Sequence, residues 1–192
     1  MSVAPATSAP KEMSVEEFLA LPDDGVSREL IRGQLKERGM TIRNRFHCDV
    51  EVNIAFELEN WLRGQPKPRG KIVSGEAGFR LRGTRDSVVG IDVAFASAEL
   101  VMASGPEDRI FNGPPVLAVE ILSPSDTQED IVEMIQLYLE AGVVVWVVDT
   151  DFPLVRIHRP GQIPVTLNRT QEIAGDPELA GLRIPVAAFF ED

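Results

Sequence analysis

The stretch PPVLAVEILSPSD, residues 114–126, decides the fold. Its centre, VLAVEIL, is a run of aliphatic residues that predicts a buried strand. Glu120 interrupts this run. A carboxylate is costly to bury unless it is paired, protonated or bound to a metal ion. Glu120 is therefore the first candidate functional residue.

After this strand the pattern changes to a helix and then back to a strand. In DIVEMIQLYLEAG the apolar residues follow helical spacing, and Gly142 marks the end of the helix. VVVWVVD, residues 143–149, is a strongly hydrophobic strand. Strand, helix and strand in this order predict a parallel crossover unit, with VLAVEIL beside VVVWVV.

Shorter elements surround this unit. SVEEFLALP predicts a short helix that Ser14 caps, and Glu17 completes a capping box. RELIRGQLKERG predicts a hairpin around residues 32–33. Asn44 is suited to cap a longer helix over about residues 45–63. Extended segments are predicted at residues 71–83, 87–96 and 154–159, and a helical turn at residues 97–103.

Length and composition bound the organisation of the chain. Its 192 residues are enough for one domain with a sizeable core. The hydrophobic share of 44% and the charged share of 26% are typical of a soluble globular protein. Residues 1–12 are rich in Ser, Ala and Pro and predict a flexible tail. We therefore expect a single domain over residues 13–192.

The apolar runs and the single cysteine indicate in which cellular compartment the protein is expected. VVVWVV is too short to span a bilayer, and the N-terminus has no apolar signal-peptide core. Cys48 is the only cysteine, which excludes an intrachain disulfide and a cysteine-rich zinc site. We expect a protein of the reducing cytoplasm that has no membrane partner.

Charge is distributed unevenly along the chain. The net charge of −11 argues against a general nucleic-acid coat. Residues 1–90 nevertheless carry 14 Lys and Arg against 13 Asp and Glu, whereas residues 91–192 carry 5 against 17. Solvated surface charge is the favoured interpretation of the basic residues. The alternative is a phosphate-facing side on an otherwise acidic protein.

Asp92 resembles Glu120 in its setting, because it lies within the apolar strand VVGIDVAFA. Two inward carboxylates on neighbouring strands repel each other unless a cation or a proton lies between them. A divalent ion such as Mg²⁺ prefers such oxygen ligands. The alternatives are an Asp hydrogen-bonded to a turn at a strand end and a Glu that faces solvent.

Several fragments, taken in order, carry a family resemblance. RELIRG, GEAGFRL, IDVAF, VEILSPS, YLEAGV and WVVD resemble the putative restriction endonuclease family of the Uma type, a branch of the PD-(D/E)xK nuclease superfamily. The match runs from about Glu29 to Asp149 and is specific only as an ensemble. The resemblance implies an α/β, restriction-endonuclease-like fold, with a mixed, curved central sheet flanked by helices.

The resemblance also implies site residues. Asp92 takes the place of the Asp in the PD element, where Ile91 replaces the usual proline. Glu120 takes the acidic position of the (D/E)xK element, so both would be ligands of Mg²⁺ or Mn²⁺. Glu29 matches an acidic position that orients a metal-bound water or completes the site. His47 matches a histidine at the start of the long helix, for which we favour an ordinary helix-start role.

The sequence departs from the superfamily at one position that matters. A lysine two residues after the Glu, or moved onto the next helix, helps to position or activate the attacking water. Here Leu122 and Met134 occupy those two places. Lys71 or Arg80 is the candidate to replace it from another strand.

Two functions follow from these features. The first is metal-dependent hydrolysis of phosphodiester bonds in DNA, weakened by the missing lysine, by a protein that acts as a homo-oligomer, most simply a dimer. The alternative is a catalytically inactive nuclease-fold protein that serves as a binding or assembly module. A small-molecule enzyme has little support, because the chain has no Gly-rich phosphate loop and no GxSxG turn.

Overall fold

The fold is described from a computed structural model, which places residues 12–38, 44–105, 107–124 and 126–191. The tail expected at residues 1–12 lies outside these ranges except for its last residue.

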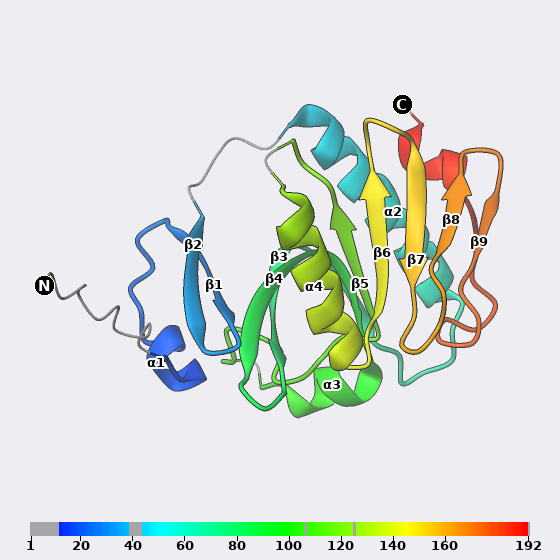
Figure 1. Ribbon diagram of the computed structural model, residues 1–192. Coiled ribbons are helices and arrows are strands. Elements are labelled where there is room, and N and C mark those ends of the chain that lie inside the picture. Colours follow the sequence, from blue (N-terminus) through cyan, green and yellow to red (C-terminus); the bar gives the residue numbers. More distant parts are fainter. Residues whose placement is uncertain (1–11, 39–43, 106, 125, 192) are drawn as a thin grey trace, which may run out of the picture.

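A large mixed sheet forms the centre of the molecule, as expected from the resemblance (Figure 1). Its strand order is β2-β1-β4-β5-β6-β7-β8, and β3 pairs with β4. The β5–β6 pair is parallel, which confirms the predicted crossover, and the other pairs are antiparallel. The strands are β1 (Ser27–Ile31), β2 (Gln34–Arg38), β3 (Lys71–Leu81), β4 (Ser87–Ala96), β5 (Leu117–Ile121), β6 (Val144–Asp149), β7 (Leu154–His158) and β8 (Val165–Asn168).

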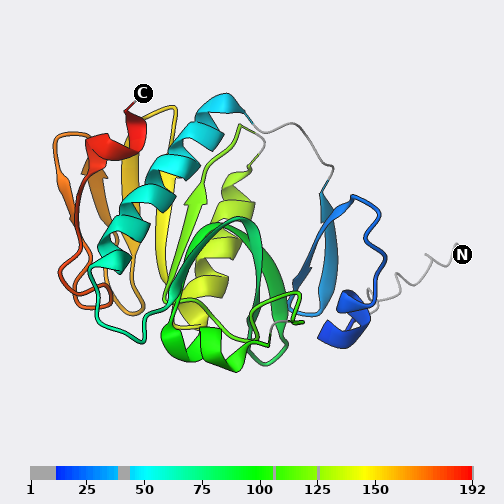
Figure 2. The same ribbon diagram turned by 180° about the vertical axis from the view of Figure 1, so that it is seen from behind.

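Helices cover both faces of this sheet. The crossover helix α4 lies on one face (Figure 1), and the long helix α2 crosses the opposite face (Figure 2). None of the helices in the described part of the chain is long and apolar enough to cross a membrane. The helices are α1 (Val15–Leu19), α2 (Arg45–Arg63), α3 (Ala98–Ala103), α4 (Gln128–Glu140) and the 3₁₀ helix η1 (Val186–Phe190).

Local sequence signals account for the helix ends. Ser14 and Glu17 form the predicted capping box of α1. The side chain of Asn44 accepts a hydrogen bond from the backbone of α2, as predicted. Thr127 caps α4 in the same way, and Gly142, with φ of 80°, follows its end.

The α2 helix buries a narrower stripe than its apolar residues suggest. Ile54 and Leu58 are fully buried, whereas Phe56 is 61% exposed. Residue 56 lies two positions from each of them, so it is turned about 200° away from the buried face. The helix buries His47 instead, on the same side as Val50 and Ile54.

The β1–β2 hairpin turns at the predicted place. Arg32 and Gly33 have positive φ angles of 48° and 78°, the conformation of a tight turn that matches strand twist. The register sets Glu29 opposite Lys36. Opposite residues of an antiparallel pair project to the same face, so these two side chains share one side of the hairpin.

The C-terminal segment was not predicted from the sequence. It contains a small second sheet, β9 (Glu172–Ala174) and β10 (Arg183–Pro185), followed by η1. Three-residue strands are too short for a periodic pattern to show. Their apolar residues nevertheless join α2 and the main sheet in one hydrophobic cluster, to which the segment contributes Ile173, Leu179, Leu182, Ile184, Val186 and Phe189.

His158, at the end of β7, makes stability depend on pH. Its side chain is buried, and its Nε2 has no hydrogen-bond partner among the described residues. Burial, reinforced by the charge of Arg156, lowers the pKa of His158 below its usual value of 6.5. In the unfolded chain the His158 imidazole takes up a proton near pH 6.5, whereas in the folded chain it stays neutral at that pH. The free energy of unfolding therefore falls as pH drops below that value.

We expect a His158→Asn variant to lose less stability than the wild type between about pH 8 and about pH 5.5, because the buried imidazole is gone. Urea unfolding at both pH values measures the difference. Parallel losses in the two proteins would contradict this assignment.

Candidate functional site

The sheet forks along one edge of β4. Near its start β4 pairs with β1 at Val88, and near its end it pairs with β5 over Val93–Phe95. Asp92 lies between these two pairings. The three predicted acidic residues thus come from three strands that meet at this fork: Glu29 from β1, Asp92 from β4 and Glu120 from β5.

Asp92 lies where the β4–β5 ladder stops. Its Oδ2 accepts a hydrogen bond of 2.9 Å from the backbone N–H of Ile121, which replaces a strand-to-strand bond. The other oxygen, Oδ1, lies 3.3 Å from Nε2 of His47. Asp92 is only 4% exposed, so its carboxylate is held in one orientation from both sides.

Glu120 is held from the opposite side of the sheet. The hydroxyl of Tyr138 on α4 donates a hydrogen bond of 2.5 Å to Glu120 Oε1. Tyr138 is 1% exposed, and Glu120 is half-buried. A buried phenol is thus one partner of Glu120.

Tyr138 lies within electrostatic range of all three predicted carboxylates. Burial is the main cause that raises the pKa of the Tyr138 hydroxyl well above its usual value of 10.0, and the nearby charges of Glu120, Glu29 and Asp92 add to it. The hydroxyl therefore stays protonated and remains a hydrogen-bond donor. Glu29, Asp92 and Glu120 are far apart in sequence, yet all three act on this one hydroxyl.

His47 extends this site toward α2. One donor atom each from His47, Glu51 and Asp92 lies within 4.8 Å of the others, a group that could hold a metal ion. His47 is 3% exposed, and its Nε2 is 3.9 Å from Glu51 Oε2. The backbone N–H of Gly75 on β3 donates to the other oxygen of Glu51. Imidazole and carboxylate together suit a divalent ion such as Mn²⁺.

The sequence interpretation of this helix start was incomplete. His47 was expected to play only a helix-start role, but it contacts Asp92 across the core. Glu51 was not considered, although its spacing of four residues from His47 puts both side chains on one face of a helix. That spacing was the available signal.

The two places expected for the superfamily lysine are apolar in three dimensions as well as in sequence. Leu122 and Met134 are half-buried and pack against the hydrophobic cluster beneath α4. Gln136 is exposed on another face of the helix.

The two strand residues considered as replacements lie elsewhere. Arg80 pairs with Asp86, at 2.6 Å. Lys71 is opposite Ala96, four residues past Asp92 on β4, which is about 13 Å along a strand. Arg80 lies opposite Val88, four residues before Asp92 on β4, so neither residue is opposite Asp92 in the register.

Ion pairs account for much of the basic first half of the chain, which supports the favoured interpretation of solvated surface charge. Such exposed pairs contribute little stability individually, roughly 0–1 kcal/mol. The pairs are Arg28 with Asp24 and Glu37, Arg32 with Glu140, Lys36 with Glu133, Arg45 with Asp49, Arg63 with Glu59, Arg80 with Asp86, and Arg85 with Glu12.

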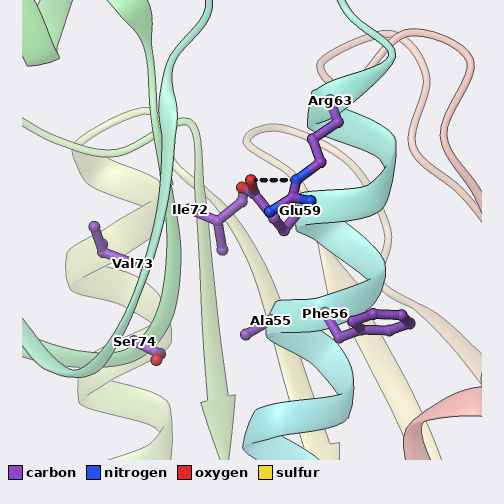
Figure 3. Close-up of a pocket in the computed structure, with 7 residues that line it drawn as sticks. All are labelled: Ala55, Phe56, Glu59, Arg63, Ile72, Val73 and Ser74. Carbon is purple, nitrogen blue, oxygen red and sulfur yellow. Dashed lines mark hydrogen bonds and ion pairs between the residues drawn. The ribbon is translucent and has the colours of Figure 1, made fainter.

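A groove of about 450 Å³ lies between α2 and β3 (Figure 3). It begins one helical turn beyond Glu51, and Ser74 on its β3 side precedes Gly75. Its two charged residues, Glu59 and Arg63, pair with each other at 3.0 Å. The groove therefore adjoins the His47 end of the site, but it carries no net charge that indicates a ligand class.

Comparison with known proteins identifies the family of this chain. The model of the Uma2 family, described as a putative restriction endonuclease, matches residues 15–187. The chain belongs to the Uma2 family. This assignment confirms the resemblance that the sequence fragments carried, and the matched residues include Glu29, Glu51, Asp92 and Glu120.

A solved structure has the same fold as this chain. It is a putative nuclease belonging to DUF820 from Anabaena variabilis, with a TM-score of 0.77 and 19% sequence identity. The alignment covers 93% of this chain and 97% of the other. At this identity the likeness establishes the nuclease-type fold. A comparison with curated proteins gave no match.

Proposed function

We propose that this protein is a metal-dependent endonuclease that hydrolyses phosphodiester bonds in DNA. The observation that carries the proposal is the cluster beside the fork, where Asp92 on β4 meets His47 and Glu51 of α2, with one donor atom of each within 4.8 Å of the others. Two carboxylates this close together repel each other unless a cation or a proton offsets their charge. Membership of the Uma2 family supports the same reaction class.

The donor set fits a divalent ion. Asp92, His47 and Glu51 offer it donor atoms that lie within 4.8 Å of one another, and Glu120 on β5 is the further ligand in this proposal. Oxygen donors suit Mg²⁺, and an imidazole nitrogen makes the site still better suited to Mn²⁺. When bound, such an ion polarises the phosphate and activates a water molecule.

The protein's own residues have distinct roles in this proposal. The Ile121 N–H and His47 fix the orientation of Asp92, and Tyr138 fixes that of Glu120. Glu29 on β1 orients a water molecule in this proposal. These contacts exist before substrate binds, so no reorganisation is needed at the moment of reaction.

Cleavage of supercoiled plasmid tests the proposal. We expect nicking and linearisation that require Mn²⁺ or Mg²⁺ and that stop when EDTA is added.

We also expect two copies of the protein to act together as a dimer, one on each DNA strand. Sedimentation analysis in the presence of DNA can measure this association. A cytoplasmic location stays a prediction from the lone, exposed Cys48.

One observation favours the alternative function. Leu122 and Met134 leave both expected lysine positions apolar, as in a catalytically inactive binding or assembly module. That alternative predicts DNA binding without cleavage under any divalent ion. A gel-shift assay run beside the plasmid assay separates the two functions.

A Tyr138→Phe variant tests how Glu120 is held. The phenyl ring still fills its buried place, but Glu120 Oε1 loses its donor. Loss of a group that orients a metal ligand weakens metal binding by about 10- to 100-fold, and we expect a fall in this range for Mn²⁺ in calorimetric titration.

Ser104→Ala serves as the control, because it also removes a hydroxyl that bonds within the fold, to Leu100 O on α3. The two variants should differ in Mn²⁺ affinity. Equal affinities in Tyr138→Phe and the wild type would show that Tyr138 does not position Glu120.

A further inference from the structure

Lys36 on β2 is placed on the α4 side of the acidic fork. It lies directly opposite Glu29 in the hairpin register, and the two side chains project to the same face. Glu29 acts electrostatically on the Tyr138 hydroxyl, which bonds Glu120. The hairpin therefore brings a positive charge to the side of the site where Glu29 and Glu120 lie.

The contacts of Lys36 place its ammonium group over one particular turn of α4. Its Nζ lies 2.5 Å from Glu133 Oε2 and 4.0 Å from Asp130 Oδ1. Met134 directly follows Glu133 and is one helical turn after Asp130. The ammonium thus stands beside the turn where the expected lysine is replaced by methionine.

The other described lysines are too far from the fork. Lys67 follows the C-terminal end of α2, whereas His47 is at its start, about 24 Å away along the helix axis. Lys71 is displaced by about 13 Å along the sheet. Within the ranges that the structure describes, Lys36 is the lysine nearest to Glu29 in register.

We infer that Lys36 supplies the positive charge that Leu122 and Met134 do not. The inference rests on the proposed nuclease function. The Lys36 side chain is 34% exposed and flexible, so its ammonium can leave Glu133 for a phosphate oxygen when DNA binds. Asp130 and Glu133 hold it at the site in the free protein.

The chemical step balances without a further reactant. The oxygen of a water molecule forms a bond to phosphorus, and one phosphorus–oxygen ester bond breaks. The attacking water gives a proton to solvent, and the leaving oxygen takes one up. Lys36 keeps its proton throughout and donates hydrogen bonds to the non-bridging phosphate oxygens, whose negative charge it offsets.

Plasmid cleavage by matched variants tests the inference. Lys36→Met keeps the aliphatic stem and removes the charge, and we expect the cleavage rate to fall by about 10²-fold with Mn²⁺ affinity unchanged. Glu133→Gln removes the ion pair but leaves the lysine, and it should cleave at least as fast as the wild type. Lys67→Met is the control for the loss of a lysine charge outside the fork.

A double variant separates a charge requirement from a structural contact. Lys36→Met combined with Met134→Lys restores an ammonium from the helix, because residue 134 is one turn before Tyr138 on the same face. We expect this variant to recover much of the lost rate. Circular dichroism confirms that each variant is folded before it is assayed.

The outcomes show separately whether the role of Lys36 fails or the proposed nuclease function fails. The inference is overturned if Lys36→Met cleaves like the wild type, or if Glu133→Gln slows cleavage by the same factor. It is also overturned if the folded double variant stays at the rate of Lys36→Met. A wild-type protein that cuts no DNA with either ion overturns the proposed function and the inference with it.

Discussion

Asp92→Asn lowers metal-dependent DNA cleavage by about 10²- to 10³-fold, the range expected when one group of a preorganised charged site is lost. The asparagine oxygen can still accept from the Ile121 N–H, so the β4–β5 junction stays intact. What is lost is the negative charge that faces His47 Nε2 at 3.3 Å. The variant should therefore be folded and nearly inactive.

Calorimetry with Mn²⁺ gives a second measurement of Asp92→Asn that does not depend on activity. We expect the binding heat to disappear, whereas Asp151→Asn, at an exposed turn, should bind and cleave like the wild type. Identical cutting by Asp92→Asn and the wild type would assign the activity to a contaminant.

Phe189→Ala has the largest expected effect on stability. Phe189 is fully buried, and its ring centroid lies 6.2 Å from that of Trp146 on β6. Removal of a buried phenyl group leaves a cavity and destabilises a protein by about 3–5 kcal/mol. Urea unfolding measures this loss of free energy.

Phe152→Ala is the matched control for that experiment, because the Phe152 side chain is 72% exposed. We expect it to change stability by less than about 0.5 kcal/mol. The Phe189 result also tests whether residues 13–192 form one domain, as we propose. If only the C-terminal segment unfolded in Phe189→Ala, and the rest kept its transition, that proposal would be wrong.

Much of the fold could be predicted because its signals are local. The alternation of apolar residues marks the strands, and Ser14 and Asn44 mark helix starts where they were predicted. Phe56 shows that an apolar residue within a helix need not belong to the core, because its angular position turns it to solvent. The C-terminal segment was missed because its strands are too short to show a period.

The candidate site could be predicted only in part. Asp92 and Glu120 stand out as charges within apolar strands, and Glu29 was indicated only by the family resemblance. Glu51 is indicated only by its spacing of four residues from His47, and Tyr138 has no signal of its own. Charged residues on a helix surface and tyrosines in a helix core are both common, so neither pattern separates a functional residue from a structural one.

The sequence by itself determined the elements before the C-terminal segment, the crossover unit and the two carboxylates that are costly to bury. Only the tertiary structure decided what those carboxylates contact. The fork of β4 brings β1 and β5 to one edge, so residues about 90 positions apart, Glu29 and Glu120, act on the same tyrosine. It also decided that Lys36 lies opposite Glu29, because hairpin register, unlike spacing along the chain, sets this pair.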